Sequence, residues 1–277
     1  MTSPDTDLAK FSRLIEALRP WLDQIIFIGG RAHRLYRERP EAVPVAYEAL
    51  QTDDADVALN PKTMTAAGSI RLRLKEFGFN EEFSGDNRPP ATHYGLGDKD
   101  AGFYAEFLTP LAGGENRRDG SPDVTERVAG VVAQKLRYLD VLLIAPWSVT
   151  VRRETGFDLP EPAMILIPNP TSYLVQKLLI HGLRKPGDRA KDALYIHDTI
   201  ELFSRSLPAL RTLWQESVGP ALHPRAVRNL RARADALFAS TSDTVRDAAL
   251  IAAPRRVTPT AIQLVCKTGL DEVLGPD

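Results

Sequence analysis

The chain has 277 residues, of which 43% are hydrophobic and 26% are charged, and this balance is typical of soluble globular proteins. With 35 basic and 36 acidic residues the net charge is -1. The overall charge therefore does not favour binding to nucleic acid or to a membrane surface. The single cysteine, Cys266, excludes an intrachain disulfide framework and a multi-cysteine zinc site. Because the N-terminus has no signal-peptide pattern and no apolar run reaches the ~18 residues of a membrane helix, we expect a cytoplasmic protein without membrane contacts.

The first part of the chain predicts alternating helices and strands. A 3.6-residue apolar period predicts a helix over 6–22, and the apolar run QIIFIGG predicts a buried strand that leads into a tight turn. A helix over 31–39 is expected to end before Pro40, and ADVALN predicts a second strand at 55–60. The segment 63–79 predicts a helix with Thr63 or Thr65 as its N-cap.

From residue 80 the pattern changes to strands and then to helices. Residues 80–110 alternate aromatic and β-branched side chains between glycine, aspartate and proline, which predicts a meander of strands. A polar loop over 112–123 is followed by strand candidates at 136–146, 147–154 and 162–170, and then by six segments with a helical period. We therefore predict an α+β fold, with a mixed β-sheet flanked by helices in an N-terminal domain over 1–168 and a helical C-terminal domain over 169–277.

A glycine pair, Gly29 and Gly30, directly follows the first predicted strand. Without a Cβ atom the backbone amides can approach a phosphate, and the next helix presents its free N–H groups to it. A plain turn at the end of the strand explains the pair at least as well, so the glycines alone favour a turn over a phosphate site.

The sequence TDDADVAL places two acids next to a predicted strand. In an extended chain Asp54 and Asp56 point to the same side. Two carboxylates beside an apolar strand are costly unless a cation neutralises them, and Mg²⁺ prefers such oxygen ligands. The alternative is a solvated acidic turn, in which Asp53 is a loop or cap residue.

A third acid, Glu106, lies within the apolar strand FYAEFLTP. An acid in a buried strand is rare unless it is paired or bound to a metal. A third carboxylate on a neighbouring strand is what a two-metal phosphoryl-transfer site requires. Glu106 therefore favours a metal site over a solvated turn.

The order of strand, Gly-Gly, helix, D-x-D strand and later acidic strand resembles the nucleotidyltransferase superfamily with the DNA polymerase β-like fold. The segment ILIPNPTSYLVQKLLIHGLRKPGDRAKDALYIHDTIELF is further similar to AbiEii-type nucleotidyltransferases, which include toxins, and to a closely similar group of uncharacterised bacterial proteins. The resemblance covers residues from about 24 to 205. It implies that Asp54, Asp56 and Glu106 hold Mg²⁺ or Mn²⁺ and that an NTP is the substrate.

The resemblance also implies roles for residues outside the three acids. Gly29, Gly30 and Arg31 stand where the superfamily has a Gly-Ser phosphate motif, so backbone amides and Arg31 are expected to replace the serine. The conserved block of the AbiEii type corresponds here to residues that include Lys177, Lys191 and Asp192. Where these proteins often have a further Asp this chain has Tyr195, and the role of the next acid, Asp198, is left open.

Lys177 lies among apolar residues of a predicted helix, YLVQKLLIHG. We expect its ammonium to neutralise charge on a leaving pyrophosphate, although a lysine at the edge of an apolar face can also extend its charged end to water. Lys191 and Asp192 open the next helix. Asp192 is expected to orient Lys177 or Lys191, or simply to favour the helix N-terminus.

The segment HPRAVRNLRARADALF carries four arginines at short spacings, namely Arg225, Arg228, Arg231 and Arg233. On a helix they form a slowly turning stripe that suits the phosphate backbone of RNA, such as a tRNA acceptor end. A solvated helix face is the competing interpretation. No histidine spacing typical of a zinc site and no nucleophile-elbow motif is present.

The sequence thus predicts an enzyme that transfers an NMP from an NTP to a hydroxyl on RNA or protein. A non-catalytic nucleotide-binding or regulatory module of the same fold is the alternative, since the motifs for binding do not by themselves require turnover. A toxin that acts together with a cognate antitoxin is a third hypothesis, implied by the AbiEii resemblance. The acceptor, the base preference and the role of the C-terminal helices are not specified by the sequence.

Overall fold

The computed structural model describes residues 4–61, 68–84, 89–97, 102–114, 116, 120 and 122–275. The contacts divide the chain into two compact units. Residues 1–32 and 50–168 form the first, which we call the sheet unit, and residues 33–49 and 169–277 form the second, the helical unit. The division of the sequence into domains 1–168 and 169–277 stays a prediction, and in the contact-based division the segment 33–49 belongs with the helices.

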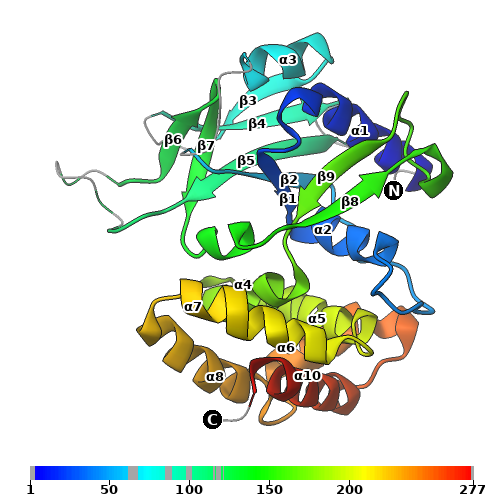
Figure 1. The fold of residues 1–277 in the computed structure, drawn as a ribbon, viewed down its shortest axis with the longest axis vertical. Coiled ribbons are helices and arrows are strands. Elements are labelled where there is room, and N and C mark those ends of the chain that lie inside the picture. Colours follow the sequence, from blue (N-terminus) through cyan, green and yellow to red (C-terminus); the bar gives the residue numbers. More distant parts are fainter. Residues whose placement is uncertain are drawn as a thin grey trace. The chain divides into compact units, whose positions relative to one another are not determined.

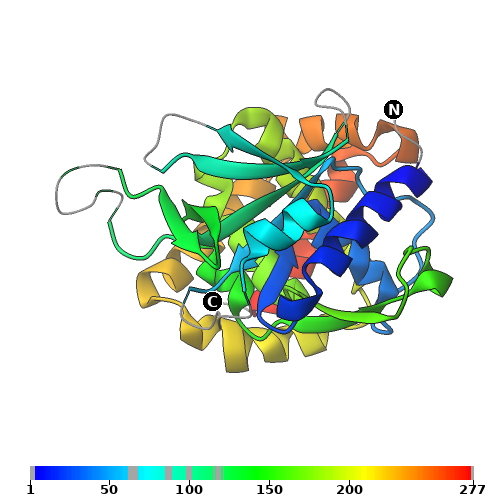
Figure 2. The same cartoon turned by 90° about the horizontal axis from the view of Figure 1, so that it is seen from above.

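Within the described residues of the sheet unit, nine strands form one mixed sheet (Figures 1 and 2). The path through the sheet is β3-β4-β5-β2-β1-β9-β8, and β7 pairs with both β5 and β6. Its strands are β1 (Ile25–Ile28), β2 (Asp54–Leu59), β3 (Asn80–Ser84), β4 (Ala91–Leu96), β5 (Phe103–Pro110), β6 (Thr125–Val128), β7 (Val131–Leu136), β8 (Trp147–Val151) and β9 (Ala163–Ile167). β2 is central: it is antiparallel to β1 and parallel to β5.

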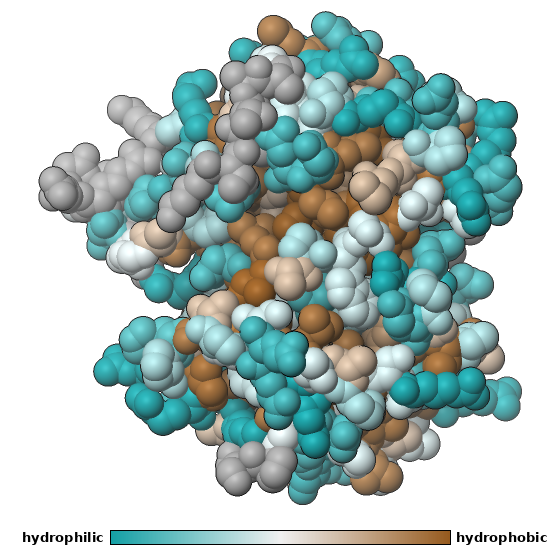
Figure 3. Space-filling view, viewed as in Figure 1, coloured by the Kyte–Doolittle hydropathy of each residue, from teal (hydrophilic) through white to brown (hydrophobic). Residues whose placement is uncertain are grey.

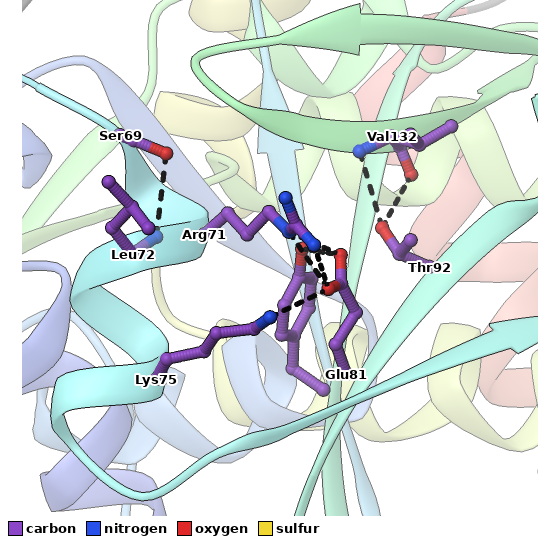
Figure 4. A network of polar contacts seen from close by, with 8 residues as sticks. Ser69, Arg71, Leu72, Lys75, Glu81, Thr92 and Val132 are labelled. Atoms are coloured by element: carbon purple, nitrogen blue, oxygen red, sulfur yellow. Dashed lines mark hydrogen bonds and ion pairs between the residues drawn. The ribbon is translucent and has the colours of Figure 1, made fainter.

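Two helices pack against this sheet and stabilise it. In α1 (Pro4–Ala17) the ring of Phe11 contacts that of Phe27 in β1 edge-on, with 5.3 Å between the ring centres. α3 (Ile70–Glu76) begins after Ser69, whose hydroxyl accepts a hydrogen bond from the amide of Leu72. Figure 4 shows how this helix is tied to β3, because Arg71 and Lys75 both contact the Glu81 carboxylate, at 2.7 and 3.1 Å.

A buried hydroxyl on β4 binds the backbone of β7. Thr92 donates a hydrogen bond to the carbonyl of Val132 at 3.1 Å and accepts one from its amide at 3.2 Å (Figure 4). Because buried backbone groups must be paired, this contact compensates Val132 where β4 and β7 approach each other. The contact thus joins β4 and β7, which both pair with β5.

Several expectations for the sheet unit are confirmed, and one is wrong. Strands are present in β1, β2, β8 and β9, and β3 to β5 form the expected meander. The strand expected at 136–146 is instead a 3₁₀ helix at Asp140–Leu143, since a short apolar run does not separate the two structures. The third helix, α3, begins at Ile70 with Ser69 as its cap, and the expected cap residues Thr63 and Thr65 lie outside the described residues.

The helical unit is built almost entirely of α-helices. These are α4 (Pro170–Ile180), α5 (Pro186–Leu202), α6 (Leu207–Leu213), α7 (Gly219–Ala221), α8 (Pro224–Phe238), α9 (Asp243–Ile251) and α10 (Pro259–Leu274), with a π-helical turn at Trp214–Val218. α4 is buried over Pro170–Leu179, and Cys266 of α10 is fully buried, which raises the pKa of its thiol. The predicted α+β fold with a helical C-terminal region is confirmed.

The short helix α2 (Gly29–Leu35) starts in the sheet unit, and its second half belongs to the helical unit. Hydrophobic and hydrophilic side chains are interspersed on the visible face of each unit (Figure 3). Within the described residues no helix is both long enough and apolar enough to cross a membrane.

Candidate active site

The three acids expected to bind metal lie on two adjacent strands. β2 and β5 run parallel in a register that pairs Asp54 with Tyr104 and Asp56 with Glu106. Residues paired across neighbouring strands project to the same side of a sheet. Asp54, Asp56 and Glu106 therefore share one sheet face, which we call the acidic face.

The opposite face of the same strands is apolar. Ala55 and Ala105, which alternate with the acids, are fully buried, and Phe27 of β1, paired with Val57, packs against Phe11 of α1. The period of two in the sequence thus separates a hydrophobic core from a row of carboxylates. This separation is what allows the acids to remain accessible on strands in the middle of the sheet.

Gly29 lies directly against one of these carboxylates. It follows β1, whose last residue Ile28 pairs with Asp56, and its φ of +67° is in the left-handed region that favours glycine. A Cβ atom at this position would lie 2.1 Å from Oδ2 of Asp56. Any other residue would displace the Asp56 side chain, so the glycine is required by both the turn and the acid.

The acidic face concentrates negative charge. Burial raises the pKa of Tyr104 to about 12, and the carboxylates of Asp54, Glu106, Asp56 and Asp53 add to the rise. A tyrosine pKa rises in this way in response to nearby negative charge, so the field of these acids reaches the Tyr104 hydroxyl. Such a focus of charge attracts cations.

The Glu106 carboxyl has an environment of its own. Burial raises its pKa, His93 opposes the rise, and Asp54 adds to it. Nε2 of His93 lies 3.4 Å from Oε1 of Glu106. Among the described residues no lysine or arginine side chain forms an ion pair with Asp54 or Glu106, and His93 is the basic side chain that contacts Glu106 there.

Arg31 is engaged within the sheet unit. Its guanidinium is 3% exposed, forms two contacts with Asp7 at 2.5 and 2.7 Å, and donates to the carbonyls of Thr52 at 2.7 Å and Asp54 at 3.3 Å. It also lies over the ring of Phe103. Arg31 therefore fixes the backbone that enters β2, and its contact with a nucleotide stays a prediction.

In the helical unit, Lys177 and Asp192 are brought together from α4 and α5. Nζ of Lys177 donates to Oδ1 of Asp192 at 2.6 Å, and Nε of Arg184 lies 3.3 Å from Oδ2. The ammonium is 5.3 and 5.2 Å from the ring centres of Tyr173 and Tyr195. This nearly buried pair is the contact by which Asp192 can orient Lys177.

The remaining basic residues have mixed surroundings. Lys191 is half-buried, with Nζ 5.9 Å from the ring centre of Tyr195. On α8, Arg225 and Arg228 are exposed, whereas Arg231 donates to the carbonyl of Leu274 and Arg233 to that of Leu179. Two of the four arginines thus bind carbonyls at the ends of neighbouring helices.

One further cluster was not expected from the sequence. His197, Asp198 and Glu201 are the one group of three ligand-type residues in the described ranges whose ligand atoms all lie within 4.8 Å of one another. However, Arg255 contacts Asp198 at 2.7 Å and the Tyr47 hydroxyl donates to Glu201 at 2.7 Å. Burial would raise the pKa of Asp198, but His197, His33 and Arg255 hold it below its usual range.

The partners in this cluster change its interpretation. A guanidinium on Asp198 supplies the positive charge that a metal would otherwise bring. Asp198 therefore ties α5 to the turn at Ala253–Arg255. The acids of the acidic face do not meet the same 4.8 Å limit, but a two-ion site distributes its ligands over ions about 3.5–4 Å apart and does not require it.

Comparison with known proteins decides the family. A family model described as Nucleotidyltransferase matches residues 6–219. The chain belongs to the nucleotidyltransferase family. No curated protein and no solved structure matches it. The match includes α1, the strands of the acidic face and both helices of the Lys177–Asp192 pair, so this nucleotidyltransferase carries all its predicted site residues within the family region.

The sequence patterns did not identify two residues of this nucleotidyltransferase that contact predicted site residues. His93 is placed opposite Glu106 by the antiparallel register of β4 and β5, and Asp7 pairs with Arg31 across 24 residues. Alternation in ATHYGLG and FYAEFLTP gives the face of each residue but not the register between the strands. No local signal identifies the Asp7 contact.

Proposed function

We propose that the protein transfers a nucleoside monophosphate from an NTP to a hydroxyl group and releases pyrophosphate, with Mg²⁺ or Mn²⁺ as cofactor. Nucleotidyl transfer in general follows from the family. The observation that carries the proposal for this chain is the pairing of Asp56 with Glu106 on one face, with Gly29 against Asp56.

The residues of the acidic face fit a divalent metal. Carboxylate oxygens are the ligands that Mg²⁺ prefers, and the absence of a Cβ at Gly29 leaves room for the Asp56 carboxylate in its present position. Bound there, such ions lower the pKa of an attacking hydroxyl and neutralise charge on the phosphates. Asp54, Asp56 and Glu106 would hold the ions.

Other residues would bind and orient the nucleotide. The amides of Gly29 and Gly30 would approach its phosphates, and Arg31 supports the segment that leads into β2. Lys177 would neutralise the leaving pyrophosphate. Asp192 would hold Lys177 in position through the 2.6 Å contact, with Lys191 beside it.

The acceptor is the least constrained part of the proposal. RNA, including a tRNA end, and protein hydroxyls are both candidates, and the exposed Arg225 and Arg228 favour a phosphate backbone. By resemblance to the AbiEii type we propose a toxin-like role in the cytoplasm with a cognate antitoxin. The catalytic domain would be residues 1–168 and the helical domain 169–277.

A non-catalytic nucleotide-binding module is the second candidate. Arg31 and Lys177 both have protein partners and are nearly buried. Two cations expected at the nucleotide are therefore engaged within the fold, as a regulatory rather than a catalytic module would allow.

The test uses the position of the label. The purified protein is incubated with each NTP labelled at the α- or the γ-phosphate, with Mg²⁺ or Mn²⁺, and with total tRNA or cell protein. The proposal expects transfer of the α-label alone, and its loss in Asp56→Ala. Nucleotide binding without transfer of either label would favour the module, and transfer of the γ-label would contradict nucleotidyl transfer.

A further inference from the structure

His93 is the histidine that the sheet brings to the acidic face. β4 and β5 form an antiparallel pair in which His93 lies directly opposite Glu106. Residues directly opposite in such a pair project to the same side, and Glu106 is itself paired with Asp56 on β2. Three adjacent strands thus place one imidazole and two carboxylates in a row.

The spacing of the donor atoms fits a shared ion. Nε2 of His93 and Oε1 of Glu106 are 3.4 Å apart. Two donors about 2.1 Å from one ion are about 3.0 Å apart in an octahedral site and about 3.4 Å apart in a tetrahedral one. The two side chains can therefore bind the same ion with little movement.

The imidazole is also held and accessible. Its ring stacks on that of Tyr104, with 5.7 Å between the centres and 22° between the planes. The His93 and Glu106 side chains are 31% and 23% exposed, and both His93 and Tyr104 line a cavity of about 210 Å³ together with Asn80 and Glu82. An ion from solvent can reach the pair.

We propose that His93 is a direct ligand of the divalent ion held by Glu106, which gives the site one nitrogen donor and a preference for Mn²⁺ or Co²⁺ over Mg²⁺. The inference rests on the metal site of the proposed function. Imidazole suits the later transition metals, whereas Mg²⁺ is bound almost wholly through oxygen. A site made of Asp and Glu alone would show a weaker preference, because it lacks the nitrogen donor.

Affinity by itself does not distinguish a ligand from a residue that merely orients Glu106. Loss of a hydrogen-bonding partner of a ligand typically weakens metal binding about 10–100-fold, and loss of a ligand can weaken it as much. The two roles differ in whether a nitrogen atom is bonded to the ion. The test must therefore detect that nitrogen.

The experiment is electron spin-echo spectroscopy of Mn²⁺ bound to the full chain, at Mn²⁺ concentrations that saturate each variant. We expect a ¹⁴N coupling of a directly bound imidazole in the wild type, and no such coupling in His93→Gln. His223→Asn is the matched control, because this exposed histidine caps α8 and Asn is also a good cap; the coupling should persist in it.

Titrations complete the test. We expect His93→Gln to weaken Co²⁺ binding by about tenfold or more and Mg²⁺ binding by much less, with circular dichroism unchanged. Bound Mn²⁺ without ¹⁴N coupling in the wild type, or coupling that persists in His93→Gln, overturns the inference. Neither result depends on nucleotidyl transfer, so failure of the proposed function would be seen separately, as absence of α-label transfer in the wild type.

Discussion

Two groups of carboxylates, one in each unit of this nucleotidyltransferase, have different neighbours. In the helical unit, Asp192 contacts Lys177 at 2.6 Å and Asp198 contacts Arg255 at 2.7 Å. In the sheet unit, Asp54 and Glu106 form no ion pair with a lysine or arginine of the described chain. The first group is compensated by lysine and arginine side chains of the fold itself, and under the proposed function the second group binds a cation from outside.

Under the proposed function, this difference separates acids that stabilise the fold from acids that take part in catalysis. A buried acid whose partner is removed destabilises a protein strongly. Acids gathered on one accessible face repel one another, and such sites typically lower stability in exchange for function. Substitutions in the two units should therefore affect stability and activity in opposite ways.

The largest effect is expected at the acidic face. Asp56→Asn should reduce α-label transfer by about 1000-fold, because metal-ion stabilisation of several kcal/mol is lost. The free energy of unfolding should stay within about 0.5 kcal/mol or rise. Asp53→Asn is the matched control, since Asp53 is exposed and adjacent; equal losses in both variants would contradict a specific role of Asp56.

The next effect is expected at the buried pair of the helical unit. Lys177→Met should lower the free energy of unfolding by about 3 kcal/mol, because Asp192 is left with the more distant Arg184 alone. Urea denaturation measures this change. Lys185→Met, at an exposed lysine, should cost less than about 0.5 kcal/mol, and a similar small cost for Lys177→Met would show that the pair does not stabilise the fold.

A smaller, pH-dependent effect is expected at His33. It is fully buried among Tyr36, Tyr173 and Tyr195, and burial lowers its pKa to about 3. Between the unfolded and folded pKa values only the unfolded chain binds the proton, so stability falls as pH falls below about 6.5.

Between pH 6.5 and pH 5, His33 should lower the free energy of unfolding by about 2 kcal/mol. His33→Phe should remove that part of the decrease, as measured by urea denaturation at several pH values. The exposed His223→Asn should not. Parallel pH profiles for wild type and His33→Phe would show that His33 is protonated in the folded protein.

The smallest effect is expected at the glycine turn. Gly29→Ala and Gly113→Ala both place a Cβ on a residue with positive φ, but only at Gly29 does the Cβ meet another atom, Oδ2 of Asp56. Gly113→Ala should cost about 1 kcal/mol, and Gly29→Ala about 1 kcal/mol more. Thermal unfolding gives the difference, and equal costs would mean that Asp56 moves aside freely.

Local patterns explain which parts of the fold could be predicted. Alternation places Asp54, Asp56 and Glu106 on their faces, and helical periods locate α4, α5, α6, α8, α9 and α10, because both depend on neighbours in sequence. The strand expected at 136–146 is a 3₁₀ helix, since its apolar run has no decisive period. The pairing of Asp56 with Glu106, of His93 with Glu106 and of Asp7 with Arg31 depends on contacts distant in sequence, which no local pattern specifies.

The location of the bound ion tests the central claim most directly. Equilibrium binding of Mn²⁺ is measured for the wild type, for Asp56→Asn and for Glu201→Gln, the last in the cluster with His197 and Asp198. A metal site on the acidic face predicts that Asp56→Asn loses tight Mn²⁺ binding and that Glu201→Gln retains it. Retention in Asp56→Asn with loss in Glu201→Gln would contradict the claim and place the ion in the helical unit.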